Sequence, residues 1–378
     1  RTGQISSTFS VMANRAFVYG CYGYTGVLIV REAIEKGVPI VIGGRNREKC
    51  EALAKKHGLD VEKDVFVFNL DDEKAVDDAF TALPDDVTTV MSVAGPYSET
   101  FDIMIGACLK SKLHYLDVTG EIEVFEKAFH LDSKAKEAGI TILPGCGLDV
   151  VPTDCLAAHL KQRMPDAVSL ELAFGTLGAV ESDMPSASRG TMRTMMNGLG
   201  KSTLHRKDGE IVPISYGSRK IPFTAEKSTP STLIPWGDVS TAYHSTGIPN
   251  IKCYMMTPGS LDRTMWWASF SFVRWILRSL PQSWKEKAIP EWGPTEESFK
   301  NCKGVFWGEV TNSNGDKLSS RCSSLPSYPL TAVTAVEMMK RLLLENDPEK
   351  HGFQTPSTMF GANFICEADA TAKFEDIE

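Results

Sequence analysis

The stretch FVYGCYGYTG, residues 17–26, places three glycines, Gly20, Gly23 and Gly26, directly after a short apolar run. Such a run is typical of a buried strand, and the residues from Tyr24 onward have helical spacing. Gly20 permits a tight turn, Gly23 allows backbone N–H groups to approach a ligand, and Gly26 allows the helix to pack closely on the strand. Because the positive end of the helix dipole points at the same place, the turn suits a pyrophosphate.

The surrounding pattern supports this interpretation. Short apolar runs occupy residues 15–20, 39–43, 64–68, 87–94, 113–118 and 139–143. Stretches with helical spacing separate them, at residues 25–36, 46–57, 72–82, 99–111 and 122–138. This alternation predicts an α/β fold, a Rossmann-type doubly wound parallel sheet with helices on both faces. A glycine triplet between the first strand and first helix then predicts dinucleotide binding, with an ordinary strand–helix turn as the alternative. The predicted cofactor-binding residues of the turn are Gly20, Tyr22, Gly23, Tyr24, Thr25 and Gly26.

The end of the second predicted strand bears on which dinucleotide binds. NAD sites usually carry an Asp or Glu about 20 residues after the glycines, where it accepts a hydrogen bond from the ribose 2′-OH. Here residues 43–49 read GGRNREK, so the strand ends in Arg45, and Arg47 follows closely. A guanidinium is matched to a 2′-phosphate. The sequence therefore favours NADP(H) over NAD(H), although a solvated basic helix turn would look the same.

The length of 378 residues predicts more than one domain. We expect the Rossmann domain at 13–165 and an α+β domain for substrate binding or dimerisation at 166–328, with a C-terminal return toward the first domain at 329–378. The second domain contains strand-like stretches at 168–176, 211–216 and 239–256, which predict a mainly antiparallel sheet. A helix is predicted at 330–345, and 352–366 is the segment expected to return. Residues 1–12 are interpreted as a leader or an expression remnant.

Composition narrows the class of protein. A net charge of −8 and the lack of a basic stripe argue against a nucleic-acid partner. Nine scattered cysteines without a C-x-x-C pair, and histidines without metal-ligand spacing, argue for a reducing, cytoplasmic setting and against a metal site. No run of apolar residues is long enough to span a membrane.

Five motifs occur in order along the chain. They are GCYGYTG (20–26), GGR (43–45), VAGPY (93–97), YLDVTGE (115–121) and PGCGLDVVPTD (144–154). Together they resemble the saccharopine dehydrogenase-like oxidoreductases, a family that includes the mycobacterial trans-acting enoyl reductases. The resemblance is close over residues 15–160. Beyond them fewer residues match, at RGT (189–191), PWGD (235–238), STGIPN (245–250) and FQTP (353–356). It implies a Rossmann domain, a nicotinamide cofactor and a substrate domain inserted before a C-terminal return. The chain departs from the family at Cys21 and Tyr22, where the family usually has Ala followed by Thr or Ser. The departure leaves the turn intact but changes the wall beside the pyrophosphate.

The carboxyl ends of the later strands are where a doubly wound sheet binds its ligands. Ala94, Gly95 and Pro96 end the fourth strand, and this turn is predicted to lie along the cofactor. Hydride transfer to C=O or C=N requires a proton donor near the nicotinamide. The candidates are Tyr97 and Asp149, with Tyr115 behind them, and each has a structural role as its alternative.

Two carboxylates, Asp117 and Glu121, lie within five residues of each other at the end of the fifth predicted strand. Acid–base chemistry and helix capping are both open interpretations of this pair.

Residues 263–285 combine aromatic rings with arginines. As one helix they would place Trp266, Phe270, Val273, Leu277 and Leu280 on one stripe, with Arg263, Arg274 and Arg278 on another face. That pattern is typical of an interfacial amphipathic helix. A helix that covers the substrate sheet or a dimer partner is the alternative.

The sequence thus predicts an NADP(H)-dependent oxidoreductase that transfers hydride to or from a C=O, C=N or C=C group of a small or lipid-like substrate, as a homodimer. One alternative is a non-catalytic dinucleotide- or ligand-binding protein of the same fold. A third is a protein that associates with a membrane or lipid surface through 263–285.

Overall fold

The computed structural model describes residues 14–178, 187–198, 200–257, 259–268, 270–281, 284, 287, 289, 293–345 and 347–377. The proposed leader, residues 1–12, lies outside this part of the chain. Within it, no helix is both long and apolar enough to cross a membrane.

The first sheet has seven parallel strands in the order β15-β6-β5-β4-β1-β2-β3. Its strands are β1 (Arg15–Tyr19), β2 (Ile40–Gly44), β3 (Val65–Val67), β4 (Val87–Ser92), β5 (His114–Asp117), β6 (Thr141–Leu143) and β15 (Gly352–Phe353). The order changes direction at β1, as in a doubly wound nucleotide-binding sheet. The predicted Rossmann-type fold is confirmed. The last strand comes from the C-terminal part of the chain, where Gly352 pairs with Thr141.

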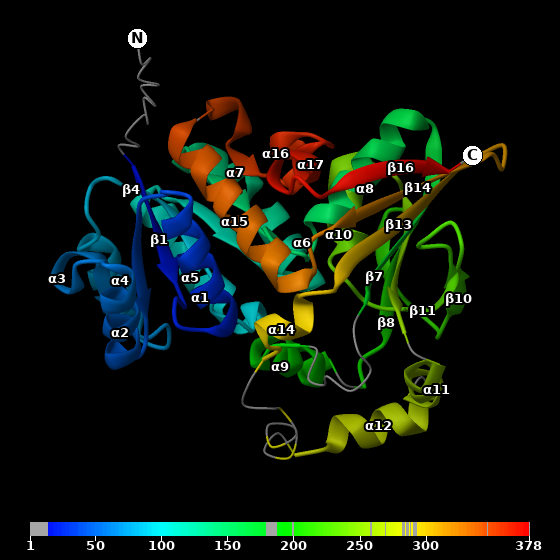
Figure 1. The fold of residues 1–378 in the computed structure, drawn as a ribbon, viewed down its shortest axis with the longest axis horizontal. Helices are drawn as coiled ribbons and strands as arrows, with labels where there is room; N and C mark the ends of the chain where they lie inside the picture. Colours follow the sequence, from blue (N-terminus) through cyan, green and yellow to red (C-terminus); the bar gives the residue numbers. More distant parts are fainter. Residues whose placement is uncertain are drawn as a thin grey trace, which may run out of the picture.

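Helices connect these strands and cover the sheet (Figure 1). They are α1 (Tyr24–Glu35), α2 (Arg47–His57), α3 (Val61–Asp64), α4 (Glu73–Thr81), α5 (Tyr97–Ser111), α6 (Ile122–His130), α7 (Asp132–Ala138) and α8 (Val151–Arg163). Local sequence sets their ends. Asn46 and Asp72 cap α2 and α4 with side-chain oxygens, while Gly58 and Gly139 end α2 and α7 in the left-handed conformation.

The second sheet has nine strands and is mixed. The main path runs through β10 (Ser218–Ile221), β11 (Thr229–Leu233), β12 (Asn250–Met256), β7 (Ala167–Leu177), β13 (Lys303–Asn312), β14 (Lys317–Ser324) and β16 (Lys373–Ile377). The strands β8 (Thr203–Lys207) and β9 (Glu210–Ile214) attach beside β12. Neighbours are antiparallel except β12 and β7, which are parallel. The predicted second α+β domain with a mainly antiparallel sheet is confirmed; the pair β12–β7 makes the sheet mixed.

Three predicted elements differ from the structure. The helix predicted over 122–138 is interrupted at Leu131, which separates α6 from α7. The strand predicted over 239–256 is helix α10 (Asp238–Thr246) followed by β12. Val239 and Ala242 are buried because α10 packs on α8 and α6, and Gly247 ends the helix in the left-handed conformation. The local alternation of apolar and polar residues resembled a strand, but tertiary packing favours the helix.

The single helix predicted over 263–285 is two helices, α11 (Gly259–Ala268) and α12 (Ser271–Ser279), within the described residues. Phe270 has extended dihedral angles (φ −70°, ψ 136°), so the helical stripe is interrupted there. Leu280 is extended as well, which follows from the steric effect of Pro281 on the residue before it. Residues 269, 282, 283 and 285 of the predicted helix lie outside the described residues.

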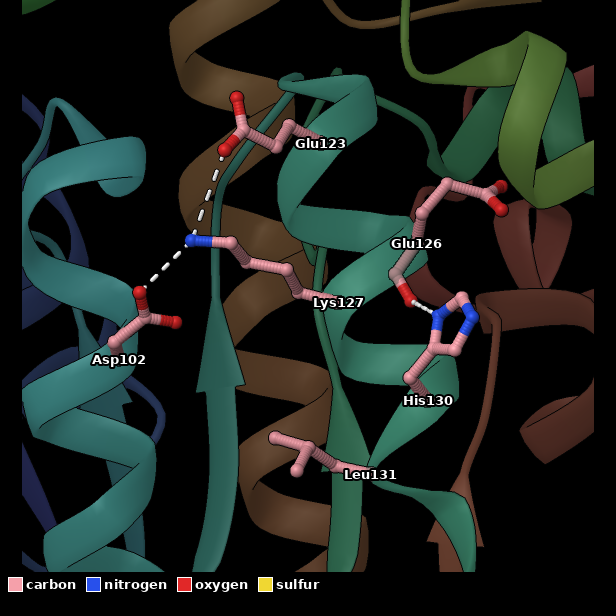
Figure 2. Close-up of a pocket in the computed structure, with 6 residues that line it drawn as sticks. All are labelled: Asp102, Glu123, Glu126, Lys127, His130 and Leu131. Carbon is pink, nitrogen blue, oxygen red and sulfur yellow. Dashed lines mark hydrogen bonds and ion pairs between the residues drawn. The ribbon is translucent and has the colours of Figure 1, made fainter.

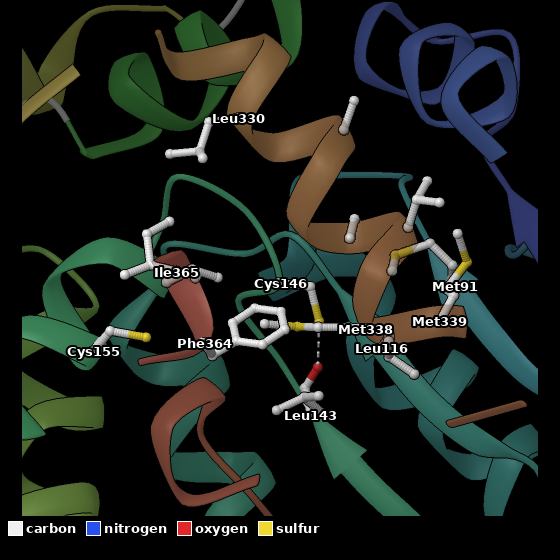
Figure 3. Packing of buried hydrophobic residues seen from close by; sticks show 14 of the residues in the cluster. Met91, Leu116, Leu143, Cys146, Cys155, Leu330, Met338, Met339, Phe364 and Ile365 are labelled. Carbon is white, nitrogen blue, oxygen red and sulfur yellow. Dashed lines mark hydrogen bonds between the residues drawn. The ribbon is translucent and has the colours of Figure 1, made fainter. Parts of the chain in front are cut away.

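A continuous apolar core joins the sheets and the C-terminal helices. Helix α15 (Ser327–Leu344) crosses between the two sheets in Figure 1 and packs against α1. Met338 from α15 and Phe364 from α17 (Phe364–Ala368) lie around Cys146, just beyond β6 (Figure 3). The C-terminal helices therefore help to position the loop that follows β6.

Candidate dinucleotide-binding and active site

The glycine turn follows β1 and is held by close backbone contacts. Gly20 has φ +86°, and a Cβ there would lie 2.8 Å from the Val93 carbonyl carbon. A Cβ on Gly26 would overlap the Gly20 carbonyl oxygen and lie 2.8 Å from the Cys21 carbonyl oxygen. Gly23 is less confined, since its nearest neighbour would be the Gly20 oxygen at 3.2 Å. Gly20 and Gly26 are thus required by the turn itself, whereas the open side of the turn lies at Gly23.

Helix α1 begins directly at this turn, and its first turn has no side-chain cap. The next helices differ, because Asn46 Oδ1 accepts from Lys49 N at 2.9 Å in α2 and Asp72 Oδ1 accepts from Ala75 N at 3.0 Å in α4. Helix N–H groups that no side chain caps are the donors that bind phosphate. The turn therefore fits the diphosphate of a dinucleotide.

An aromatic ring and basic side chains lie at the end of β2. The Tyr22 ring contacts Gly44, where a Cβ would lie 2.7 Å from Tyr22 Cε1, and Lys49 Nζ lies 5.7 Å from the centre of that ring. Arg45 follows Gly44 directly and is exposed. Arg47 is also exposed, but its guanidinium lies 3.4 Å from Glu51. The Tyr22 ring and Arg45 therefore lie together beside the carboxyl end of β2.

The side chains of Tyr24 and Cys21 are occupied by packing. The Tyr24 hydroxyl donates to the Pro294 carbonyl at 2.6 Å, and its ring lies edge-on to Tyr328 of α15. The Cys21 Sγ is buried 3.7 Å from Cys50 Sγ of α2. Thr25 lies in the first turn of α1, so its backbone N–H is among the uncapped donors. The side chain of Tyr24 is occupied, so its backbone N–H, in the same first turn of α1, is the group that it can offer to a ligand.

The loop after β4 lies beside the glycine turn, as the contact of Gly20 with Val93 requires. The Ala94 carbonyl accepts from Thr100 Oγ1 at 2.7 Å, Gly95 is exposed and Pro96 is buried. The predicted cofactor residues at 94–96 and at 20–26 are therefore neighbours in space.

Tyr97 begins α5 and is buried, and its hydroxyl donates to the Ser92 carbonyl at 3.3 Å. Burial raises the pKa of this phenol well above its ordinary value. The Glu121 carboxylate accepts from the N–H groups of Tyr97 and Ser98 at 2.8 and 3.0 Å, so it caps the N-terminus of α5. These contacts favour a packing role for Tyr97 and a capping role for Glu121.

Asp117 ends β5 and organises the loops around it. Its Oδ1 accepts from Thr119 N and Gly145 N at 2.9 and 3.0 Å, and its Oδ2 accepts from the Tyr115 hydroxyl at 2.8 Å. Burial raises the pKa of this carboxyl to about 6, although the three donors lower it. Asp117 and Tyr115 therefore form a buried structural pair that joins the ends of β5 and β6.

We expect Asp117→Ala to lower the free energy of unfolding by about 3–5 kcal/mol, because three buried donors lose their acceptor. Asp117→Asn keeps an oxygen for the two backbone N–H groups and should lose less. Urea unfolding of the three proteins measures both changes. Equal stability of the alanine variant and the wild type would contradict this role.

Asp149 follows β6 and is partly buried against the second domain. Trp236 Nε1 donates to its Oδ1 at 3.1 Å, and a Cβ on Gly120 would lie 2.9 Å from its Oδ2. Burial and the nearby Asp238 raise the pKa of Asp149 to about 7, although the Trp236 hydrogen bond lowers it. Of the two predicted proton donors, Asp149 is the one with a pKa near neutrality.

Two residues that the sequence did not single out complete this junction. Trp236 belongs to the quoted PWGD motif, but its contact with Asp149 depends on how the domains pack. Asp238, two residues after Trp236, is buried, and burial raises the pKa of its carboxyl to about 6.

Asp154 has a structural contact: its carboxylate accepts from Ser357 N at 2.7 Å and so ties α8 to the C-terminal segment. In the part of the chain that the structure describes, no three His, Cys, Asp or Glu side chains are grouped to hold a metal.

A surface hollow of about 380 Å³ lies elsewhere, between α5 and α6 (Figure 2). It is lined by Asp102, Glu123, Glu126, Lys127, His130 and Leu131, none of which is a predicted site residue. Lys127 lies 2.8 Å from Asp102 and 3.7 Å from Glu123. In this hollow, the ammonium group of Lys127 is therefore paired with the carboxylates of Asp102 and Glu123 rather than directed at a ligand.

Glu126 at the edge of this hollow links α6 to the second domain. It accepts from Arg206 and Ser240 at 2.6 and 2.5 Å and lies 3.3 Å from His244 Nε2. Burial raises its pKa, but the hydrogen bonds and the charge of Arg206 lower it to about 2. The carboxylate thus stabilises the junction between the domains as an anion.

Comparison with known proteins agrees with this geometry. Residues 16–143 match the saccharopine dehydrogenase NADP binding domain. A human saccharopine dehydrogenase-like oxidoreductase is 23% identical over 208 residues, covering 50% of this chain and 47% of the relative. Residues 16–143 thus carry the NADP-binding domain of the saccharopine dehydrogenases, and the chain is similar to saccharopine dehydrogenase-like oxidoreductases. The resemblance that the sequence motifs predicted is confirmed.

Other relatives extend the comparison. The lipid droplet localized protein of Caenorhabditis elegans is 27% identical over 331 residues, which cover 77% of this chain and 76% of that protein. A trans-acting enoyl reductase of Mycobacterium ulcerans is 27% identical over 181 residues, covering 47% of this chain and 42% of the relative. Several matches, the human protein included, therefore span less than half of the relative's length.

Among solved structures, saccharopine dehydrogenase (L-Glu forming) from Saccharomyces cerevisiae superposes with a TM-score of 0.59 at 12% identity. The likeness covers 97% of this chain and all of that one, and it concerns the fold.

Proposed function

We propose that this protein is an NADP(H)-dependent oxidoreductase that transfers hydride to or from a C=O, C=N or C=C group. The observation that carries the proposal is the uncapped first turn of α1 at Gly23, beside a strand end that offers Arg45 and no carboxylate. The matched NADP-binding domain supports binding of a nicotinamide dinucleotide. The choice of NADP(H) over NAD(H) rests on Arg45.

The chain's own groups would hold the cofactor at three places. Backbone N–H groups of residues 24–26 would bind the diphosphate, and Arg45 would bind the 2′-phosphate with Tyr22 beside the adenosine. The loop 94–96 would lie along the cofactor toward the carboxyl ends of β5 and β6. A bound nicotinamide supplies or accepts the hydride.

Asp149 is the residue that we propose as the proton donor or acceptor. It lies at the carboxyl ends of β5 and β6, where the two domains meet, and the N–H of Trp236 fixes the orientation of its carboxyl group. A pKa of about 7 allows this group to hold a proton and to release it near neutral pH. Trp236 is then a positioning residue that sets where the proton is held.

We propose a small or lipid-like molecule with a reducible C=O, C=N or C=C bond as the substrate. The name of the mycobacterial relative, an enoyl reductase, supports a C=C group as one candidate. Loss of NADPH absorbance with a panel of ketones, imines and enoyl thioesters tests the proposal. Tight NADPH binding without turnover of any panel member would favour the non-catalytic alternative.

The pKa of Asp149 gives a pH prediction for the reductive direction. A donor must be protonated, so kcat/KM should fall as the pH rises through about 7. We expect Asp149→Asn to lower kcat by roughly 10²–10⁴-fold and to remove this inflection. Cofactor affinity, measured by NADPH fluorescence, should stay unchanged because Asp149 lies away from the glycine turn. An Asn variant with wild-type kcat and the same pH profile would exclude Asp149 as the donor.

A further inference from the structure

Helices α11 and α12 expose an unusual number of aromatic rings. Trp267 is 57% exposed, Phe272 70% and Trp275 64%. We call these rings, together with Trp266, Phe270 and Ile276, the aromatic face. Large apolar side chains that gather on one surface mark a contact with a partner. The catalytic proposal above makes no use of this surface.

The orientation of α12 sets which side chains face outward. Phe272, Trp275 and Ile276, at spacings of three and four, are exposed, while Val273 and Leu277 are only partly exposed. This helix therefore presents its larger apolar side chains to the exterior rather than to the core. Figure 1 shows α11 and α12 at the lower margin of the molecule, below the second sheet and away from the first.

A basic hollow lies behind the aromatic face. Arg278 Nε donates to the Gly200 carbonyl at 2.8 Å, and an Arg274 guanidinium nitrogen lies 3.0 Å from Ser202 Oγ. Together with Trp275, the side chains of Ser202, Arg274 and Arg278 line a hollow of about 240 Å³. Two guanidinium groups and a hydroxyl line the hollow, and these are the group types that bind a phosphate.

The positive charge of this surface favours a lipid surface, rather than a second copy of the chain, as its partner. Residues 259–281 contain three arginines, Arg263, Arg274 and Arg278, and one aspartate, within a chain of net charge −8. In a two-fold dimer the same patch faces itself, so these arginines would approach their own copies. An anionic phospholipid surface instead supplies the opposite charge, and tryptophan and phenylalanine rings insert favourably at headgroup level.

We propose that the aromatic face docks on a phospholipid surface, with an anionic headgroup phosphate in the hollow between Arg274 and Arg278. The nine residues of α12 rise about 14 Å, roughly half of a hydrocarbon core of about 30 Å. The helix therefore lies along the surface with its rings among the headgroups. The surface would bring the protein to substrates that are dissolved in lipid.

Flotation with phosphatidylcholine vesicles, with and without phosphatidylserine, tests the proposal on the full chain. Wild type should float with the anionic vesicles and lose binding as salt is raised. Phe272→Ser with Trp275→Ser should lower the partition at least tenfold. Arg274→Gln with Arg278→Gln should lower it about tenfold or more on anionic vesicles and little on neutral ones, since each cation near such a surface contributes about fivefold.

Matched controls separate docking from loss of fold. Leu344→Ser removes a 50% exposed side chain at the end of α15, and Lys63→Gln removes an exposed charge on α3. Both should float as wild type does. NADPH affinity should be unchanged in all variants, because α11 and α12 lie away from the first sheet (Figure 1). Thermal unfolding checks that each variant is folded, and a lower midpoint is expected for the Arg274/Arg278 variant, which loses the hydrogen bonds to Ser202 and Gly200.

Three outcomes would overturn the proposal. Wild type that binds no vesicle but forms a dimer, which the Phe272/Trp275 variant converts to monomer by light scattering, would make the face an interface between copies. Saturable binding of inorganic phosphate without vesicle binding would assign the hollow to a free anion. Equal flotation of wild type and both double variants would place lipid contact elsewhere.

Discussion

Replacing Gly23 by valine is expected to abolish NADP(H) binding while the chain stays folded. Gly23 has φ −66° and ψ 164°, a conformation that any residue adopts, and its Cβ would meet only the Gly20 oxygen, at 3.2 Å. The added methyl groups would occupy the open side of the turn, where the diphosphate approaches the backbone. Losing two charge-assisted hydrogen bonds corresponds to at least a hundredfold weaker binding.

Gly26→Val serves as the contrasting variant for this experiment. Its Cβ would overlap the Gly20 oxygen and crowd the Cys21 backbone, so the loss should be one of stability as well as of binding. Calorimetric titration and thermal unfolding of both variants separate the two effects. A folded Gly23→Val protein with wild-type affinity would remove the glycine turn from the cofactor site.

Arg45→Asp is expected to invert the cofactor preference. The wild-type guanidinium follows Gly44 at the end of β2, and a charge-assisted bond to the 2′-phosphate contributes about 1.5–3 kcal/mol, roughly ten- to a hundredfold in affinity. Aspartate would repel the phosphate, and it would accept a hydrogen bond from a free 2′-OH. NADPH should therefore bind more weakly than NADH to the variant.

Arg47→Ala is the matched comparison for Arg45. Arg47 is exposed in the first turn of α2 and already pairs with Glu51, so its loss should weaken NADPH binding less than the loss of Arg45. Both variants need titration at one ionic strength, because salt screens these contacts. An unchanged ratio of the two affinities in Arg45→Asp would show that the 2′-position is bound elsewhere.

Local sequence was sufficient for six of the seven strands of the first sheet; the seventh, β15, comes from the C-terminal segment that was expected to return, where no strand was predicted. Buried strands that alternate with helices leave few topologies, and the glycines of 20–26 can serve only a tight strand–helix turn. The same local signals failed for α10, where polar and apolar residues alternate as in a strand, and at Phe270, which interrupts the predicted amphipathic helix. For α10, tertiary packing outweighed periodicity; at Phe270, the extended backbone interrupts the helix.

The candidate site was predictable only where it depends on neighbouring residues in the chain. The turn at Gly23 and the basic end of β2 are local features. The environment of Asp149 is not a local feature of the sequence. Its raised pKa follows from burial beside Asp238, and the orientation of its carboxyl group follows from Trp236, 87 positions further along the chain. The packing role of Tyr97 likewise became evident only from the contact of its hydroxyl with Ser92.

The most direct test of the central claim is a paired titration of the wild-type protein with NADPH and NADH at one ionic strength. Binding at the uncapped turn of α1, with Arg45 at the 2′-phosphate, predicts that NADPH binds roughly ten- to a hundredfold more tightly than NADH. Equal affinities, tighter binding of NADH, or no binding of either cofactor to the folded protein would contradict it.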